Sequence, residues 1–324
     1  MASKRILVLG ASGFIGGRVV AAMTGTELLA VAGRYRAAPP PKERHESVHV
    51  DATSDSSLCQ ALEGIDGIVN CVAGEPQTIV ASACALRAAA SRMGTAPQVV
   101  HLSSMAVYGL ATGSVDESAP MRSDLSAYGS AKARAEVELL AYPATVILRP
   151  GIVYGPGSNN WSELIGALLL AGRLGDLGDE GLGYCNLVHV DDVAAAVVRA
   201  LTVPALAGQV FNLALASPPT WNDYFLHYAD ALGAPHQRIS ASRLFLELNV
   251  ASPALMLASL VARRARLGLQ PPAAIRPWLI ALCRHRLRID TRKATDVLGM
   301  QWTPLERGLQ QTAQWLHAKR GHRR

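Results

Sequence analysis

The chain has 324 residues, of which 50% are hydrophobic and 17% are charged, and its formal net charge is +6. This composition is ample for a large buried core, and the length suits one large α/β domain or a domain with an appendage. The excess of Lys and Arg is concentrated late in the chain without any recognised nucleic-acid-binding module, so a solvated basic end is favoured over nucleic-acid binding.

The N-terminus and the cysteines both indicate a cytoplasmic protein. Residues 1–5 lead straight into a strand-like run, without the architecture of a signal peptide. The five cysteines show neither paired spacing nor a metal-ligand pattern, which favours reduced thiols and no bound metal. They are Cys59, Cys71, Cys84, Cys185 and Cys283.

The most apolar stretch of the chain covers residues 244–262. Glu247, Asn249 and Pro253 interrupt it, so we expect a poor membrane span and no membrane contact. A segment that lies on a membrane or lines an apolar pocket is the alternative to ordinary core helices.

Short apolar runs alternate with helical stretches through the first half of the chain. The runs expected to form strands cover residues 6–9, 28–32, 48–50, 68–72, 98–102 and 145–148. Helices are expected from about residue 15 to 23, over the alanine-rich residues 81–90, and around Tyr128 and Lys132. This alternation predicts an α/β fold with a doubly wound parallel Rossmann sheet, whose ligand binds beyond the carboxyl ends of the strands.

The pattern changes after Gly155. The elements expected there are a helix at residues 161–170, a glycine-rich loop at 172–183, strands at 188–190 and 211–213, and a helix beginning at Asp191. From Trp221 onward the chain is predicted to be largely helical, with proline breaks. We therefore expect a dinucleotide-binding Rossmann domain of residues 1–155 plus about 186–215, and a smaller, mostly helical substrate lobe of about 156–185 and 216–324.

A glycine-rich turn at residues 10–16 joins the first strand to the first helix. Gly10 permits a tight turn, Gly13 lets the backbone approach a pyrophosphate, and Gly16 allows close packing of the helix on the strand. The helix N-terminus would meet the phosphate charge, whereas a purely structural turn is the alternative. The cofactor-binding candidates here are Gly10, Ser12, Gly13, Phe14, Ile15 and Gly16.

The end of the second strand distinguishes between the two nicotinamide cofactors. NAD sites usually place an acid there, to accept hydrogen bonds from the ribose 2′-hydroxyl. This chain has Gly33 in that position, followed by Arg34 and then Arg36. Because an arginine pairs with a 2′-phosphate that a carboxylate would repel, we favour NADP(H) over NAD(H). Solvated loop charges are the alternative explanation of the arginines.

Two further pairs of residues follow predicted strands. Asp51 and Ala52 come after the third strand and are candidates for contact with the adenine. Ala73 and Gly74 come after the fourth strand and are candidates to border the cofactor. A turn-forming aspartate and a packing glycine are the competing explanations.

A tyrosine and a lysine mark the second predicted half of the site. Tyr128 and Lys132 are four residues apart on a predicted helix, so they share one face, and the ammonium can act on the acidity of the phenol. Ser103 and Ser104 lie at the end of the fifth strand. Neighbouring strand residues point in opposite directions, so the register decides which serine faces the tyrosine.

These motifs, in this order, resemble the extended short-chain dehydrogenase/reductases, the superfamily that includes the NAD-dependent epimerase/dehydratase group. The resemblance extends through most of the chain. Its segments are residues 10–16, 70–74, 101–109, 116–117, the helix of Tyr128 and Lys132, and residues 148–157, 188–194, 290–294 and 298–304.

The resemblance implies a role for each member of the site. Tyr128 would be the general acid/base, and Lys132 would tune it and hold the nicotinamide ribose. Ser104 matches the catalytic Ser/Thr of the superfamily, with Ser103 as the second candidate, and Val153 is assigned to the cofactor. The resemblance also implies a homodimer that packs through residues 81–90 and the helix of Tyr128. Free tyrosine has a pKa of about 10, so we expect the ammonium and the nicotinamide to lower the pKa of Tyr128.

The substrate is less constrained than the reaction. In many nucleotide-sugar enzymes of this superfamily an asparagine follows the sixth strand and contacts the substrate diphosphate, whereas this chain has Ile152 there. Isoleucine cannot donate a hydrogen bond to phosphate, which disfavours a sugar-diphosphate substrate. The loop at 172–183 could close over a ligand, and the apolar region 244–269 fits a greasy substrate or a lipid-facing lid.

The leading hypothesis is an NADP(H)-dependent oxidoreductase that interconverts a carbonyl and a secondary alcohol of a small molecule. The alternative is a nucleotide-sugar epimerase or dehydratase that retains NAD. A third hypothesis is a redox-sensing or scaffold protein, against which the presence of Ser104, Tyr128 and Lys132 argues.

Overall fold

The structure is a computed structural model that describes residues 3–34, 46–122, 124, 126–264 and 272–321. The chain divides into two compact units. Unit 1 consists of Met1–Val153, Val188–Ala216 and Ile289–Trp302, and unit 2 consists of Tyr154–Leu187, Ser217–Arg288 and Thr303–Arg324.

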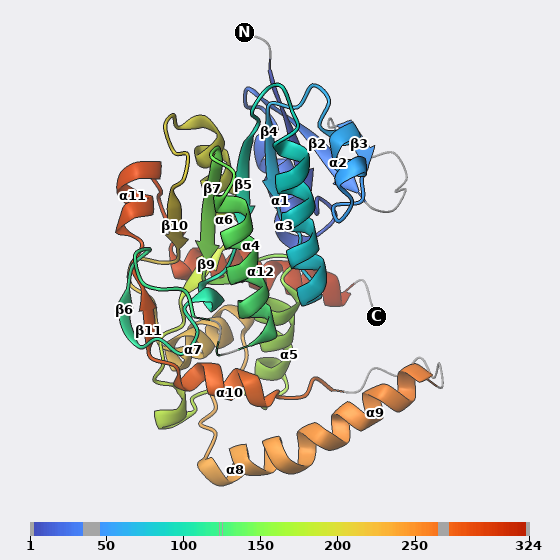
Figure 1. The fold of residues 1–324 in the computed structure, drawn as a ribbon. Coiled ribbons are helices and arrows are strands. Elements are labelled where there is room, and N and C mark those ends of the chain that lie inside the picture. The colour runs from blue at the N-terminus through green and yellow to red at the C-terminus, as the bar shows by residue number, and fades with distance from the viewer. Residues whose placement is uncertain (1–2, 35–45, 123, 125, 265–271, 322–324) are drawn as a thin grey trace. The chain divides into compact units, whose positions relative to one another are not determined.

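Unit 1 is built on a seven-stranded sheet with the strand order β10-β7-β5-β4-β1-β2-β3 (Figure 1). Every neighbouring pair in it is parallel. The strands are β1 (Lys4–Leu9), β2 (Leu28–Arg34), β3 (Glu46–His49), β4 (Gly67–Asn70), β5 (Gln98–Leu102), β7 (Thr145–Pro150) and β10 (Val210–Leu213). The strand order reverses direction between β1 and β4, which confirms the predicted doubly wound Rossmann sheet.

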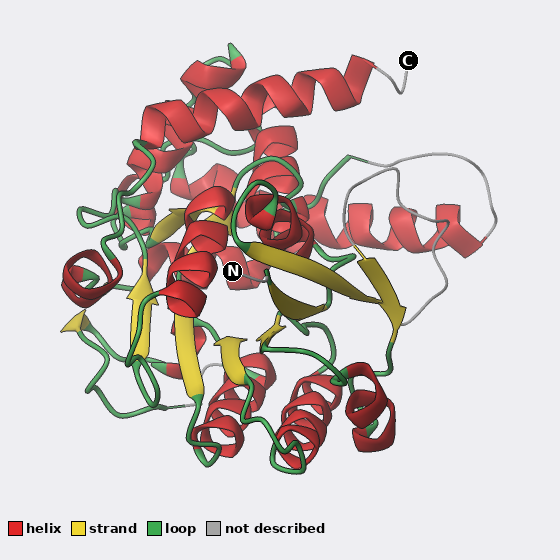
Figure 2. Ribbon diagram, turned by 90° about the horizontal axis from the view of Figure 1, so that it is seen from above, coloured by secondary structure: helices red, strands yellow, loops and turns green. Residues whose placement is uncertain are grey.

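Helices cover both faces of this sheet (Figure 2). One face carries α1 (Phe14–Met23), α6 (Val190–Thr202) and α11 (Arg292–Leu298), and the other carries α2 (Asp55–Ala61), α3 (Pro76–Ala90) and α4 (Ala127–Leu140). Two short elements precede α4, the 3₁₀ turn η1 (Met105–Val107) and the strand β6 (Gly113–Val115).

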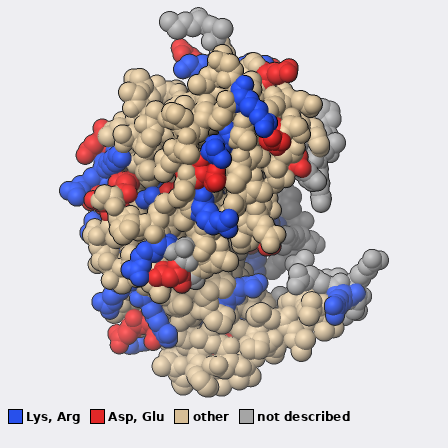
Figure 3. Space-filling view, viewed as in Figure 1, with Lys and Arg blue, Asp and Glu red and all other residues tan. Residues whose placement is uncertain are grey.

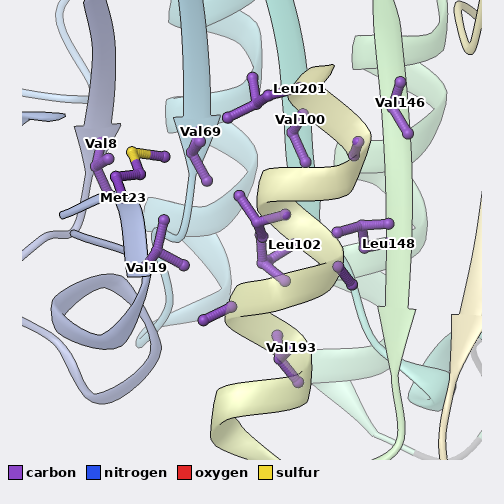
Figure 4. Close-up of a cluster of buried hydrophobic side chains, with 14 of the residues drawn as sticks. Val8, Val19, Met23, Val69, Val100, Leu102, Val146, Leu148, Val193 and Leu201 are labelled. Atoms are coloured by element: carbon purple, nitrogen blue, oxygen red, sulfur yellow. The ribbon is translucent and has the colours of Figure 1, made fainter. Parts of the chain in front are cut away.

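The core of unit 1 consists of two apolar layers, one on each side of the sheet. Val8, Val69 and Val100 point to the α1–α6 side, where they meet side chains such as Val19 and Leu201 (Figure 4). The alternate residues of the same strands point to the α2–α4 side; they are Leu7, Ile68 and Val99. Burial on both faces explains why these strands are continuous apolar runs in the sequence.

The assignment of residues 289–302 differs from the sequence-based domain boundaries, which placed the whole of 216–324 in the second lobe. This segment belongs to unit 1, because α11 packs on β10 and α6 and buries Ala294 and Leu298 in the first core layer. The Asn212 amide of β10 donates to the Asp290 carbonyl over 3.1 Å, which holds the start of the segment in place.

Unit 2 is mostly helical. Its helices are η2 (Asn159–Leu164, a π-helix), α5 (Ile165–Leu170), η3 (Gly178–Gly181), α7 (Trp221–Leu232), α8 (Ala241–Leu246), η4 (Glu247–Ala251), α9 (Ser252–Arg264), α10 (Pro277–Arg284) and α12 (Leu305–Gly321). Buried aromatic side chains on α7 form its core, with Trp221, Tyr224, Phe225 and Tyr228 in ring contact along the helix. Three short strands occur where the chain passes between units: β8 (Ile152–Tyr154), β9 (Leu187–His189) and β11 (Leu287–Ile289).

The apolar stretch near residue 250 is more regular than the sequence indicates. α8, η4 and α9 form one continuous helix, Ala241–Ala262, which by length and composition alone is apolar enough to cross a membrane. Pro253 lies within this continuous helix, directly after the π-helical turn η4 (Glu247–Ala251), and does not end it.

Candidate active site

The turn between β1 and α1 has the geometry that its glycines require. Gly10 has φ +76°, and a Cβ added there would lie 3.0 Å from the Cys71 carbonyl oxygen. At Gly16 an added Cβ would lie 2.2 Å from the Gly10 carbonyl oxygen, so only glycine lets α1 start this close to the turn. No side chain of the described chain caps α1 at Gly13, so its first backbone N–H groups point into the turn.

The other members of this turn divide into exposed and packed residues. Ser12 and Gly13 are exposed, whereas Phe14 and Ile15 are half-buried and pack against the core layer of α1. A pyrophosphate would therefore contact the backbone of the turn and the Ser12 hydroxyl.

The position where NAD sites carry an acid is closed in this protein. A Cβ at Gly33 would lie 2.9 Å from Val50 Cγ1 and 3.1 Å from the Val8 carbonyl oxygen. An acidic side chain there would have to displace the Val50 side chain and crowd the β1 backbone. Arg34 ends β2 opposite His49, but its side chain and all of Arg36 lie outside the described residues.

The residues after β3 are partly committed to a local turn. Asp51 Oδ1 accepts hydrogen bonds from the Thr53 N–H at 2.9 Å and the Thr53 hydroxyl at 2.7 Å, which lower the pKa of this carboxyl. These two hydrogen bonds explain the position of one carboxylate oxygen of Asp51 without any bound ligand. Ala52 is half-buried against the second core layer.

The segment that follows β4 has exposed residues at the carboxyl edge of the sheet. Asn70 Oδ1 accepts a hydrogen bond from the Val72 N–H at 3.0 Å, which shapes the turn. Ala73 and Gly74 are exposed, Gly74 has φ +117°, and an added Cβ there would meet no atom within 4 Å. Glycine is thus required at this position for its backbone conformation and not for packing.

Two hydroxyl caps bring α4 to the end of β5. Ser104 Oγ accepts a hydrogen bond from the Ala106 N–H at 3.2 Å and so begins η1, while Ser126 Oγ accepts one from the Gly129 N–H at 3.0 Å and so begins α4. A Cβ at Gly129 would lie 2.7 Å from the Ala106 carbonyl oxygen, so glycine lets α4 approach η1. This approach places Tyr128 beside Ser104.

Tyr128 is 39% exposed, and the Ser104 hydroxyl lies near enough to its phenol to lower the pKa of that phenol. Partial burial raises the pKa of Tyr128 above its ordinary value, and the Ser104 hydroxyl only partly offsets that rise.

Lys132 is buried beneath the tyrosine, with its Nζ 5.9 Å from the centre of the Tyr128 ring. The ammonium donates to the Leu102 carbonyl at 2.6 Å and the Val72 carbonyl at 3.3 Å, and so joins the ends of β5 and β4. Burial lowers the pKa of Lys132 to about 8.

The expected effect of Lys132 on the phenol is therefore not present in this structure. Among the described residues, Ser104 is the one group that lowers the pKa of Tyr128, and the net shift is upward. The reason is geometric: the ammonium points to two backbone carbonyls below the ring and not to the phenol oxygen.

The comparisons with known proteins agree with this arrangement. The family model described as "NAD dependent epimerase/dehydratase family" matches residues 6–214, which include the glycine turn, Ser104, Tyr128 and Lys132. The chain belongs to the NAD dependent epimerase/dehydratase family.

Similar proteins include enzymes with different reactions. The 2′-dehydrokanamycin reductase of Streptomyces kanamyceticus is 28% identical over 249 residues, which cover 73% of this chain and 69% of the relative. The structure of MoeE5 in complex with UDP-glucose and NAD has a TM-score of 0.72 at 23% identity and covers 98% of this chain and 99% of its own. The dTDP-glucose 4,6-dehydratase from Bacillus anthracis, in complex with NAD, has a TM-score of 0.74 at 20% identity and covers 98% of each chain. At these identities the two structures share the fold.

In this epimerase/dehydratase family member, Ser103 and Ser104 have separate tasks. Ser103 follows the alternation of β5 toward α4, and its hydroxyl donates to the buried carboxylate of Glu136. It does not face Tyr128, whose partner is Ser104. The register that the sequence left open therefore places Ser104 in the site.

A buried network behind the site was missed in the sequence. Arg149 of β7 forms a bidentate ion pair with Glu136 of α4, with its Nη2 2.7 Å from Oε2 and its Nε 3.0 Å from Oε1. Arg149 also donates to the Tyr108 hydroxyl at 3.0 Å, which in turn donates to Asn212 Oδ1 at 2.7 Å. Glu136 is four residues beyond Lys132 on the same helix, a spacing that could have pointed to it.

The other predicted or polar residues near the carboxyl edge of the sheet are buried or half-buried. Val153 is 8% exposed in the first core layer, and Ile152 is 2% exposed. His101 is buried with no hydrogen-bond partner among the described residues, and burial holds its pKa well below 6.5, so it stays neutral. Burial raises the pKa of Cys71 to about 12. Nowhere in the described ranges do three or more His, Cys, Asp or Glu side chains gather as a metal site.

Unit 2 contains a cavity of about 500 Å³ beside the loop that was expected to close over a ligand. Gly175 and Asp176 of the loop line it, opposite Asn222 and Phe225 of α7. None of the site residues predicted from the sequence lines this cavity, since all of them belong to unit 1.

Proposed function

We propose that this protein is an NADP(H)-dependent oxidoreductase that interconverts a carbonyl and a secondary alcohol of a small molecule. The observation that carries the proposal is that the Ser104 hydroxyl lies beside the Tyr128 phenol, with Lys132 buried beneath the ring. The glycine turn that would hold the dinucleotide lies in the same unit. A relative named as a reductase, with 28% identity over most of this chain, supports this chemistry.

The chain's own residues would handle the proton of the reaction. The bound nicotinamide dinucleotide supplies or accepts the hydride at the substrate carbon. In the reductive direction, Ser104 donates a hydrogen bond to the substrate oxygen and Tyr128 transfers its phenolic proton to it. Lys132 would hold the ribose of the bound nicotinamide; its ammonium lies on the Leu102 and Val72 carbonyls and does not itself lower the pKa of Tyr128.

The pKa directions predict a pH dependence that favours reduction at neutral pH. The raised pKa of Tyr128 keeps the phenol protonated, as an acid must be, while Lys132, with a pKa of about 8, loses its charge as the pH rises through that value. We expect kcat/KM for carbonyl reduction to be level at acidic to neutral pH and to fall above about pH 8. Stopped-flow oxidation of NADPH across this range measures it. The K132M variant should lose the alkaline limb, and a wild-type profile level to pH 10 would contradict the assignment.

The preference for NADP(H) rests on the closed position at Gly33 and on Arg34 next to it. We expect NADPH to raise the melting temperature more than NADH at equal concentration, because only a 2′-phosphate pairs with an arginine. G16A should lose the shift, since its Cβ would collide with the turn, whereas G17A is the matched control, with its Cβ at 3.4 Å from the Ala11 carbonyl oxygen. Equal shifts with both cofactors, or an unchanged shift in G16A, would contradict the proposed site.

The second candidate is a nucleotide-sugar epimerase or dehydratase that retains NAD. The complexes of MoeE5 with UDP-glucose and NAD and of the Bacillus anthracis dehydratase with NAD favour it. The apolar, buried Ile152 disfavours it, because it offers no donor to a diphosphate. Oxidised NAD that remains on the purified protein through gel filtration would favour this candidate over the first.

A homodimer through α3 and α4 is part of the same proposal. α4 presents the apolar side chains of Val137 and Leu140 to solvent, with 62% and 36% of each exposed. Exposed apolar residues on a helix of this kind are typical of an interface between subunits.

A further inference from the structure

The helix Ala241–Ala262 of unit 2 exposes apolar side chains along its whole length. Only 11% of its most apolar 18-residue window is buried, and that window has a mean hydropathy of 1.7. Seven large apolar residues on it are between 44% and 63% exposed: Phe245, Leu246, Val250, Met256, Leu257, Leu260 and Val261. A contiguous apolar surface of this kind marks an interaction site with a partner or a membrane.

The two charged residues of this helix point the other way. Arg243 donates to the Gly172 carbonyl at 2.6 Å and to Gln237 Oε1 at 3.0 Å. Glu247 forms an ion pair with Arg173, and both side chains are only 13% exposed. The helix therefore turns its charges toward the body of unit 2 and its apolar residues outward, which is the reverse of an ordinary surface helix.

Two polar side chains of the helix donate hydrogen bonds to backbone carbonyls of the same helix. The exposed Asn249 donates its amide to the Phe245 carbonyl at 2.8 Å, and Ser259 donates its hydroxyl to the Leu255 carbonyl at 2.7 Å. Such bonds satisfy the Ser259 hydroxyl proton and one N–H of the Asn249 amide within the helix, which lowers the cost of placing these side chains near hydrocarbon.

One side chain of unit 2, that of Arg173, contacts the chain both near the start of the helix and after its end. Arg173 holds Glu247 at the start and donates to the Ala273 carbonyl on the return. A spanning helix would carry its far end across the bilayer, away from this point. Because Arg173 contacts the chain both before and after residues 248–262, this apolar segment can instead lie in the membrane surface.

The sequence that continues from this helix is strongly basic. Between Glu247 and Asp290 there is no acidic residue or lysine, and there are seven arginines: Arg263, Arg264, Arg266, Arg276, Arg284, Arg286 and Arg288. Since the whole chain has a formal net charge of +6, the rest of it carries a net charge of −1. The net positive charge of the protein is thus concentrated in the sequence that follows the apolar helix.

We propose that the outer face of Ala241–Ala262 lies in the surface of an anionic lipid bilayer and attaches the protein to it peripherally. The apolar side chains would enter the boundary between headgroups and acyl chains, and the arginines that follow would meet the lipid phosphates. In Figure 3 the surface along α8 and α9 is an uncharged band with blue side chains at the end of α9. A second copy of the chain is disfavoured as the occupant, because it would bring two such arginine-rich segments together.

Co-sedimentation with sucrose-loaded vesicles tests this proposal. We expect the full-length protein to bind vesicles of phosphatidylcholine with roughly 30% phosphatidylglycerol, and to bind pure phosphatidylcholine at least about tenfold more weakly. L257E places a charge on the outer face and should weaken binding about tenfold or more. V297E is the matched control, because Val297 of α11 is 44% exposed and lies outside this segment. Removing two exposed charges with R264Q/R276Q should weaken binding to the anionic vesicles by about fivefold per arginine.

Four results would overturn the proposal. They are a lack of binding to anionic vesicles, equal binding to both vesicle types, unchanged binding of L257E, and a soluble dimer that L257E disrupts without any vesicle binding. The last would assign the face to a second copy, and light scattering on the same samples measures it. An unchanged far-UV circular dichroism spectrum of each variant shows that it is folded.

Discussion

Replacing Tyr128 with phenylalanine should lower kcat for carbonyl reduction by about 10² to 10⁴ while leaving the affinity for NADPH within about twofold. The phenol is the proton donor in the proposed mechanism, and its hydroxyl interacts with the Ser104 hydroxyl. Phenylalanine keeps the ring above the Lys132 ammonium, so the packing beneath it is retained. Steady-state kinetics with a reducible carbonyl substrate, together with titration of NADPH fluorescence, separates the two effects.

The control for this variant is Y142F. The Tyr142 hydroxyl follows α4 and donates to the Pro97 carbonyl at 3.0 Å, so its removal costs a hydrogen bond without touching the site. It should lower stability by about 1 kcal/mol and leave kcat unchanged. Equal turnover in Y128F and the wild type would remove the proton-transfer role from Tyr128. A parallel loss in both variants would point to a structural effect instead.

The fold of unit 1 could be predicted from the sequence because its signals are local. Each buried strand is an apolar run, and a glycine turn or a helical stretch follows it, as with Ile6 to Leu9 and the turn after it. The short strands β6 and β8 were missed, since Gly113–Val115 is not an apolar run and Ile152–Tyr154 follows β7 after a single residue. The place of α11 was also missed, because it is set by packing on β10 far away in the sequence.

The site could be predicted only in part for a similar reason. Which residues gather at the carboxyl edge follows from strand order, but their contacts depend on three-dimensional register. In that register the Ser104 hydroxyl lies beside Tyr128, and the Ser103 hydroxyl donates to Glu136. Whether the pKa of Tyr128 is raised or lowered depends on its burial and on where the Lys132 ammonium points. The spacing of four residues predicts neither.

Replacing Arg149 with methionine should lower the free energy of unfolding by about 3–5 kcal/mol. Arg149 and Glu136 are 4% and 0% exposed at their side chains, so the variant leaves a carboxylate buried without its counter-charge. It also removes a donor from the Tyr108 hydroxyl. Urea denaturation followed by far-UV circular dichroism measures the loss. R92M is the control, because the Arg92–Asp55 pair is 60% and 44% exposed and should have little effect on stability.

The double variant E136M/R149M distinguishes an ion-pair effect from lost packing. Methionine fills similar space in both positions and leaves no buried charge, so the double variant should be more stable than R149M alone. A double variant less stable than R149M would instead mean that the side-chain volumes matter more than the charges. Because Glu136 fixes α4 against β7 and binds Ser103, which precedes Ser104, R149M should also loosen the contact between Ser104 and Tyr128. Turnover of R149M at a temperature where it is still folded should therefore fall, and the double variant should not restore it.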